Sequence, residues 1–89
     1  MITEQDKNTI IDLAKKYQIK RLFLFGSNVD SNKEARDIDL AVEGIKEELF
    51  FKFYSELIFG LSKPVDLIDL TRKNKVHEII LENSVLLYG

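Results

Sequence analysis

The chain has 89 residues, a length that fits a single domain over residues 1–89. Hydrophobic residues make up 45% of it, enough for one compact core, and the absence of cysteine excludes disulfides and thiolate metal sites. The net charge of −2 provides no positive field for nucleic acid, which argues against nucleic acid as a direct substrate and against a template-using polymerase.

The N-terminal segment predicts a helix and not a targeting signal. Residues 1–6 are polar and acidic, unlike a signal peptide, and no apolar stretch of the chain approaches the roughly 20 residues that span a bilayer. We therefore expect a cytoplasmic protein with no membrane partner. Thr3 and Asp6 have the spacing of a capping box, although Asp is not its usual last residue. Apolar residues then recur at helical spacing, at Ile10, Leu13, Ala14 and Tyr17.

Apolar runs predict the strands of a sheet. Three of them lie at about 20–25, 37–43 and 65–70. The polar stretch at 26–36 predicts a short helix with a loop. Residues 85–88 predict an additional strand at the edge of the sheet.

Two further amphipathic segments predict helices, one from Ile45 to Gly60 and one around 76–80. The whole order predicts an α/β (α+β) domain with a small mixed β-sheet and helices packed on one face. Phe51 and Phe59 fall outside the apolar stripe of the longer helix. They either complete the core or form an exposed patch for a partner.

Three carboxylates and a Gly-Ser dipeptide carry the functional signal. Gly26-Ser27 follows the first apolar run, Asp37 and Asp39 open the second, and Asp66 lies in the third. Side chains i and i+2 of a strand point the same way, so Asp37 and Asp39 project from one face, roughly 7 Å apart. Two such carboxylates repel each other, and a divalent cation with a preference for oxygen ligands, Mg²⁺ or Mn²⁺, removes that cost.

Gly26 and Ser27 have the composition of a phosphate-binding turn. Glycine permits a positive φ and a close approach of the backbone, and the serine hydroxyl adds a donor. If a helix begins there, its free N–H groups favour an anion. Structural alternatives remain for each feature: a strand-to-helix turn capped by Ser27, a solvated strand start for the Asp37 pair, and an edge position for Asp66.

Together these motifs resemble the minimal nucleotidyltransferase (MNT) domain of the polymerase-β superfamily, and within it the MNT antitoxins of HEPN/MNT toxin–antitoxin pairs. The shared signature is a hydrophobic strand, Gly-Ser, a short helix or loop, Asp-x-Asp on the next strand and a third Asp on a later strand. Here it matches Leu22 to Phe25, Gly26-Ser27, Asp37-Ile38-Asp39 and Asp66, within a resemblance that covers nearly the whole chain. Asp69 competes for the third position; it lies three residues further on, so its side chain points to the opposite face. The resemblance favours Asp66, because the Val-Asp-Leu pattern of the family falls on residues 65–67.

The resemblance implies catalytic and metal-binding roles for the three aspartates. Asp37 and Asp39 would hold the ion that bridges the nucleotide phosphates. Asp66 would help to bind a second ion and would take the proton from the attacking hydroxyl. Two ions about 3.5–4 Å apart can stabilise both the attacking and the leaving oxygens.

Nucleotide binding would fall to Gly26, Ser27 and Arg36. The chain departs from the family pattern at Asp30, where a basic residue is usual, and at Arg36, which precedes the first Asp in place of a common Ser. Arg36 is a candidate for the missing positive charge at the phosphates, or else a surface residue.

The resemblance thus implies a metal-dependent nucleotidyltransferase that uses Mg²⁺ or Mn²⁺ and moves a nucleoside monophosphate, AMP from ATP, to a hydroxyl of a protein. The implied partner is a helical HEPN toxin, for which this chain would be the antitoxin. The alternative is a catalytically weak binding module that neutralises or scaffolds its partner. Transfer to a small molecule such as an aminoglycoside is less favoured, because 89 residues leave no room for a domain that grips an acceptor.

Overall fold

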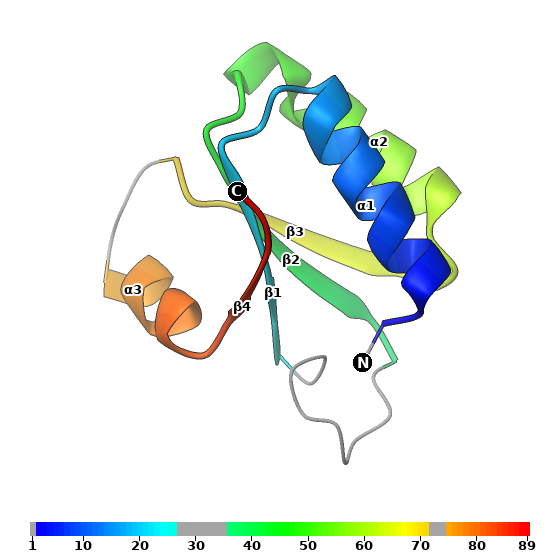
Figure 1. Cartoon of the computed structure of the whole chain (residues 1–89). Coiled ribbons are helices and arrows are strands. Elements are labelled where there is room, and N and C mark those ends of the chain that lie inside the picture. Colours follow the sequence, from blue (N-terminus) through cyan, green and yellow to red (C-terminus); the bar gives the residue numbers. More distant parts are fainter. Residues whose placement is uncertain (1, 27–35, 72–74) are drawn as a thin grey trace.

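The computed structural model describes residues 2–26, 36–71 and 75–89. In chain order they form α1 (Glu4–Lys16), β1 (Arg21–Phe25), β2 (Ile38–Glu43), a 3₁₀ turn (Glu47–Leu49), α2 (Phe50–Gly60), β3 (Val65–Asp69), α3 (Lys75–Glu82) and β4 (Val85–Tyr88) (Figure 1). All the predicted strands are confirmed within a residue. Most of the segment 26–36, for which a short helix and loop are predicted, lies outside the described residues. No described helix is long and apolar enough to cross a membrane.

The strands form one mixed, four-stranded sheet in the order β3-β2-β1-β4. Strand β1 is antiparallel to both of its neighbours, β2 and β4, whereas β2 and β3 are parallel. Helix α2 makes the crossover that parallel neighbours require. The predicted mixed sheet and the predicted edge position of residues 85–88 are both confirmed.

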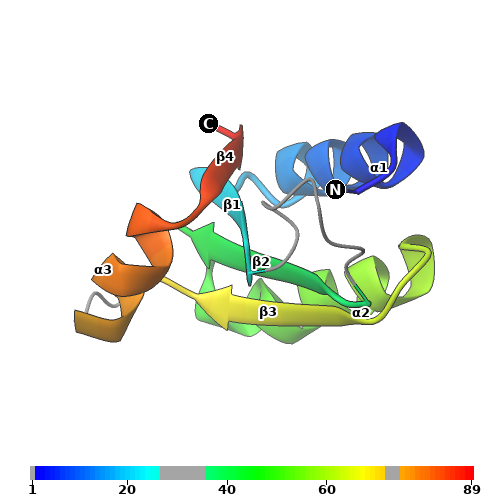
Figure 2. The ribbon, with the colours of Figure 1, turned by 90° about the horizontal axis from the view of Figure 1, so that it is seen from below.

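Two helices, α1 and α2, cover one face of the sheet, and α3 lies on the other side (Figures 1 and 2). Between the two helices and the sheet lies the apolar core. Its fully buried side chains include Ile10, Leu22, Ile38, Leu40, Val42, Phe53 and Leu57. The predicted helical layer therefore consists of α1 and α2. Helix α3 departs from it because it joins β3 at one edge of the sheet to β4 at the other, on the side that α1 and α2 leave open.

Capping determines where α1 begins. Thr3 is extended, and its hydroxyl accepts the backbone N–H of Asp6 at 3.1 Å, as the capping pattern predicts. The Asp6 carboxylate is buried and accepts hydrogen bonds from Ser62, one from the backbone N–H at 3.2 Å and one from the hydroxyl. Asp6 therefore ties the start of α1 to the turn that follows α2.

The second helix begins later than the apolar pattern predicts. Ile45 is buried in the core, and Lys46 after it is extended, with φ −66° and ψ 136°. A 3₁₀ turn follows, and α-helical geometry begins only at Phe50. The anchoring of Ile45 keeps the chain extended at a point where periodicity alone would have started a helix.

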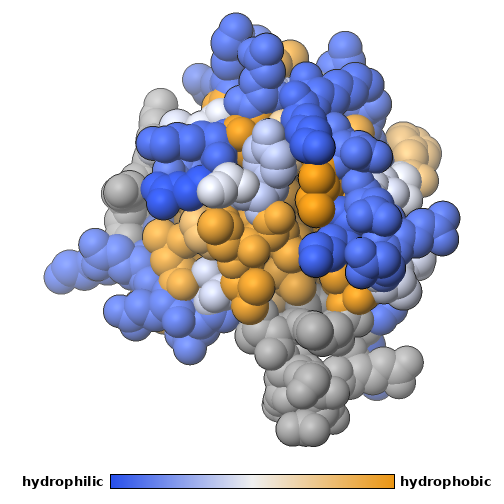
Figure 3. Space-filling model, in the orientation of Figure 1, coloured by the Kyte–Doolittle hydropathy of each residue, from blue (hydrophilic) through white to orange (hydrophobic). Residues whose placement is uncertain are grey.

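The phenylalanines of α2 divide between core and surface. Phe53 is fully buried, whereas Phe51 is 77% exposed and Phe59 is 90% exposed. Core completion is therefore wrong for these two residues, and an exposed apolar surface on α2 is confirmed. A second group of exposed apolar side chains lies on α3 and β4, where apolar surface gathers in Figure 3: Val76, Ile79, Val85 and Leu86.

Candidate metal and nucleotide site

Strand alternation sends the candidate carboxylates to the sheet face that α1 and α2 do not cover. On β2, Ile38 and Leu40 are fully buried beneath the two helices. Asp39 alternates with them, so its side chain leaves the opposite face of the strand, and Asp37 directly precedes β2. Asp37 is exposed, and Asp39 is half-buried. The same pleat thus supplies core on one side and carboxylates on the other.

The parallel register of β2 and β3 sets the third candidate carboxylate beside the pair. Asp39 and Asp66 are direct partners in the ladder, and after burial the Asp66 carboxyl is the largest cause of the raised pKa of Asp39. Parallel neighbours lie about 4.8 Å apart, so two side chains on the same face at one register position are in contact. Asp66 is exposed, which leaves this side of the pair open to solvent.

The electrostatics of Asp39 reflect its neighbours. Burial is the largest of the effects that raise the pKa of Asp39, followed by the negative charges of Asp66 and Asp37 and by the hydrogen bond to Asp66. All of these effects disfavour the ionised form of Asp39, so the described protein groups around Asp39 do not stabilise its negative charge. A divalent cation would relieve this repulsion, and the oxygen donors present suit Mg²⁺ or Mn²⁺.

Gly26 contacts the same carboxylate from β1. Phe25 is the ladder partner of Asp39, and Gly26 follows with φ +70°. A Cβ atom on Gly26 would lie 2.4 Å from Asp39 Oδ2, closer than real Cβ contacts come. Glycine is therefore needed here for its conformation and for the space that the Asp39 side chain occupies. The sequence predicts a phosphate-binding turn at Gly26 but gives no sign of this contact.

Hydrogen bonds brace the end of the sheet that carries the carboxylates. The Ile38 N–H donates to the Pro64 carbonyl at 2.8 Å, which closes the start of the β2–β3 ladder. The Tyr54 hydroxyl, from α2, donates to the Val65 carbonyl at 2.9 Å. That carbonyl belongs to the peptide that leads into Asp66. Sequence reasoning missed Tyr54, since no local pattern links a tyrosine of a helix to the outer side of a later strand.

The remaining predicted site residues are partly described. Arg36 is exposed next to Asp37, consistent with either of its two predicted roles. Ser27 and Asp30 lie outside the described residues. Over residues 2–26, 36–71 and 75–89, no group of three or more His, Cys, Asp or Glu side chains forms a ready metal site. The donors at hand are those that Mg²⁺ commonly uses together with substrate phosphates, namely one or two carboxylates.

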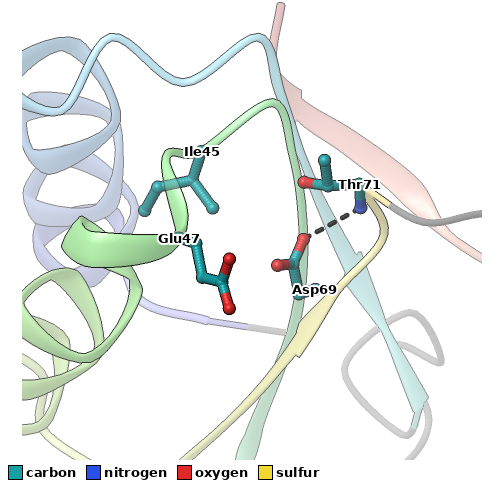
Figure 4. Close-up of a pocket in the computed structure, with 4 residues that line it drawn as sticks. All are labelled: Ile45, Glu47, Asp69 and Thr71. Carbon is teal, nitrogen blue, oxygen red and sulfur yellow. Dashed lines mark hydrogen bonds between the residues drawn. The ribbon is translucent and has the colours of Figure 1, made fainter.

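Asp69, the competitor for the third position, lies elsewhere. Its carboxylate accepts the backbone N–H of Thr71 at 2.9 Å. Figure 4 shows it facing Glu47 across a cavity of about 400 Å³, which Ile45 and Thr71 also line. Asp69 therefore belongs to the α2 side of the sheet, away from Asp66, as strand alternation predicts.

Comparison with protein families gives a match over most of the chain. Residues 8–89 match the family described as Polymerase beta, Nucleotidyltransferase. The chain belongs to this nucleotidyltransferase family. A search of curated protein sequences gave no match.

The structural neighbours of this nucleotidyltransferase domain are MNT antitoxins in complexes with HEPN toxins. A toxin–antitoxin crystal structure with AMP-PNP has a TM-score of 0.76 at 26% identity, over 93% of this chain and 73% of the other. The complex of a tri-AMPylated HEPN toxin from Shewanella oneidensis with its MNT antitoxin has a TM-score of 0.72 at 26% identity, over 94% and 70% of the chains. The toxin–antitoxin structure MntA–HepT shows the same fold, with a TM-score of 0.73 at 24% identity over 98% of this chain and 73% of the other.

Proposed function

We propose that this nucleotidyltransferase domain transfers AMP from ATP to a hydroxyl group of a protein partner, as the antitoxin of a HEPN-type toxin. The observation that carries the proposal is the pairing of Asp39 with Asp66 on the sheet face that α1 and α2 leave open, where burial and then the neighbouring carboxylates raise the pKa of Asp39. Two related structures support the nucleotide and the acceptor. One contains AMP-PNP, and the other contains a HEPN toxin that is AMPylated.

In the proposed reaction the acceptor oxygen forms a bond to the α-phosphorus of ATP, and the bond from that phosphorus to the β-phosphate bridging oxygen breaks. Pyrophosphate leaves with the electron pair of that bond. Bound Mg²⁺ or Mn²⁺ would neutralise phosphate charge and polarise the reacting oxygens. Asp37 and Asp39 would hold the ion, and Asp66 would orient the acceptor hydroxyl and accept its proton.

Nucleotide recognition falls to the turn after β1. Gly26 directly follows β1 and lies against Asp39, and with Ser27 it would form the phosphate-binding turn. Arg36 is exposed and directly precedes Asp37, so its guanidinium would add a positive charge near the phosphates. We propose that it compensates for Asp30, which stands where the family usually has a basic residue.

Titration calorimetry tests the binding step. ATP should bind measurably with Mg²⁺ and poorly without it, since the carboxylates repel phosphate unless a cation lies between them. The Asp39→Asn variant should lose this Mg²⁺ dependence. Asp69→Asn is the matched control, because Asp69 is a carboxylate of the same strand as Asp66 on the other side of the sheet. Equal affinity with and without Mg²⁺ would contradict the proposal.

A second candidate function is a binding module that neutralises its partner without catalysis. One observation favours it, the acidic Asp30 in place of the basic residue that is usual in the family. Incubation with Mg²⁺, ATP labelled at the α-phosphate and a co-purified HEPN partner separates the two functions. Transfer of label to the partner supports the enzyme, and stable binding without label supports the module.

A further inference from the structure

We propose that Tyr54 is a positioning residue, which holds the Asp66 carboxylate in place beside Asp39 through the backbone of β3. The inference rests on the proposed metal-dependent function, because it assigns a role at the same site. Its physical basis is the weak support of Asp66, which lies on an edge strand next to a carboxylate that repels it. The Tyr54 hydroxyl supports that strand from the edge.

The backbone of β3 faces two ways at the candidate site. In the described part of the chain, β3 has one strand neighbour, β2. Successive residues of a strand direct their N–H and C=O groups to opposite sides. The Pro64 carbonyl and the Leu70 N–H both bond to β2, at 2.8 and 2.7 Å. Asp66 alternates in step with these two residues and therefore bonds toward β2, whereas the Val65 carbonyl faces the open edge.

The Tyr54 hydroxyl meets that outward carbonyl. It donates to the Val65 carbonyl at 2.9 Å, an ordinary hydrogen-bond length. A peptide group is planar, so the Val65 carbonyl and the N–H of Asp66 move as one unit. The ladder thus holds this peptide from the β2 side, and Tyr54 holds it from the edge. The orientation of the peptide sets the direction in which the Asp66 side chain leaves the strand.

Helix α2 holds the Tyr54 ring in place. Phe50 lies one helical turn earlier, and the two rings meet edge to face, with centroids 6.1 Å apart and an interplanar angle of 86°. Both rings are half-buried and pack against the apolar core. Because packing already restricts the ring, the hydroxyl is presented to β3 at a fixed position.

The two carboxylates need this support because they are register partners of like charge. Like charges directly opposite each other on neighbouring strands are destabilising. Asp39 lies on β2, which is held between β1 and β3, so the repulsion acts mainly on the outer strand and on Asp66. Tyr54 gives β3 the second support that β1 gives β2. A cation shared by the two carboxylates requires them to be held to within about 0.5 Å.

The structural alternative is that the hydroxyl only attaches α2 to the sheet, and Tyr17 provides the comparison for it. The Tyr17 hydroxyl also donates a hydrogen bond within the helical layer, to the Glu56 carboxylate. Tyr17 ends α1 near the start of β1, and Asp39 pairs with the other end of that strand. Both tyrosines thus connect elements of the fold, but Tyr54 bonds to the strand that carries Asp66.

Mn²⁺ titration of the nucleotide-free protein, followed by electron paramagnetic resonance of free Mn²⁺, tests the inference. Tyr54→Phe removes the hydroxyl and keeps the ring. It should raise the Mn²⁺ dissociation constant about three- to tenfold, the scale of one lost hydrogen bond. Tyr17→Phe is the matched control, since it also removes one bonded hydroxyl and should leave the constant unchanged. Thermal melts should show a similar loss of stability in the two variants.

A comparison of kcat with KM gives a second readout in the transfer assay. Asp66 is proposed to orient the acceptor hydroxyl, so Tyr54→Phe should lower kcat about tenfold, because small misplacements of a reacting group are costly. The KM of ATP should change less than about twofold, since the nucleotide is held elsewhere in the site. Tyr17→Phe should change neither quantity. A raised KM with an unchanged kcat would contradict a role through Asp66.

The controls separate failure of this inference from failure of the proposed function. If the unchanged protein binds Mn²⁺ and Tyr54→Phe binds it equally well, or if Tyr17→Phe weakens binding as much, only the role of Tyr54 is overturned. If the unchanged protein binds no Mn²⁺, the metal site itself is contradicted, and this inference with it. All proteins are also measured in trimethylamine oxide, which favours the folded state. A Tyr54→Phe protein that stays unfolded there would overturn the inference, because the hydroxyl would then be needed for the fold as a whole.

Discussion

The two faces of the sheet differ although the same strands build both. On β2, Ile38, Leu40 and Val42 are fully buried beneath α1 and α2, while Asp39 and Glu43 leave the other face. One face provides stability through apolar burial, and the other collects charge. A single-residue step along the strand separates the two roles, so a register shift of one residue would destroy both at once.

The charged face is itself divided. At one end of β2, the buried Glu43 carboxylate accepts hydrogen bonds from Arg21 at 2.6 and 3.1 Å and lies 3.7 Å from Lys20 Nζ. At the other end, burial and then the neighbouring carboxylates of Asp66 and Asp37 raise the pKa of Asp39. A compensated carboxylate is typical of structure, whereas a carboxylate repelled by others is typical of a functional site. The predictions below test this division.

The largest effect is expected from Asp39→Asn, which should lower nucleotidyl transfer by roughly 10³–10⁴-fold, equivalent to about 4–5.5 kcal/mol. The amide cannot replace the charge that holds the cation. Stability should be kept or raised, because the change removes one of the repelling carboxylates. Transfer assays and thermal melts on the same samples measure both quantities. Full activity of the variant would show that the aspartates are only a solvated strand start.

On the apolar face, Phe53→Ala should lower the free energy of unfolding by about 3–5 kcal/mol, because Phe53 is fully buried and its loss leaves a cavity. Urea denaturation measures the loss. Under conditions in which Phe53→Ala is folded, it should bind Mn²⁺ with the affinity of the unchanged protein. A variant that loses Mn²⁺ affinity while folded would show that the two faces are coupled.

Gly26→Ala should affect both stability and metal binding. It should lower the free energy of unfolding by about 1–3 kcal/mol, since alanine disfavours the φ of +70°, and it should weaken Mn²⁺ binding by displacing Asp39. Gly44→Ala is the matched control, with a similar φ of +80° and a clash with Lys20 in place of Asp39. Denaturation and Mn²⁺ titrations on both variants separate strain from displacement. Equal Mn²⁺ affinity in the two variants would argue against the contact.

The raised pKa of Asp39 predicts a pH dependence of stability in the metal-free protein. The folded state holds the Asp39 proton more tightly than the unfolded state does, so this contribution is fully present below the ordinary Asp pKa and is lost as pH rises through the raised value. Mn²⁺ affinity should change in the opposite sense and rise with pH, because the cation needs the ionised carboxylate. Asp39→Asn should remove both dependences. Denaturation curves and Mn²⁺ titrations between pH 3 and 8, about the range in which a perturbed carboxyl titrates, measure them.

The smallest effect is expected on the outer side of α2. Phe59→Ala should change the free energy of unfolding by less than about 0.5 kcal/mol, because the side chain is 90% exposed. The same change should weaken binding only if a partner docks on α2. Thermal melts together with pull-down of a HEPN partner measure the two quantities. A large loss of stability would mean that the side chain is packed in solution.

The elements of the fold could be predicted from local patterns because those patterns act between near neighbours. Alternation of apolar and polar residues predicts the strands. Thr3 and Asp6 predict the start of α1, because their hydrogen bond joins residues only three positions apart. Where local and distant contacts compete, the prediction fails. Helix α2 starts late because Ile45 is held in the core, and Phe51 and Phe59 are exposed because only one side of α2 meets the sheet.

For the candidate site, the sequence by itself determined that Asp39 leaves the face of β2 opposite its apolar neighbours Ile38 and Leu40, because side chains alternate along a strand. It also determined that Asp66 and Asp69 point to opposite faces of β3. Only the tertiary structure decided that Asp66 is the register partner of Asp39, that Gly26 leaves the space for the Asp39 carboxylate, and that Tyr54 braces the strand beside them. These contacts join residues far apart in the chain, and their register is set by the packing of the whole core.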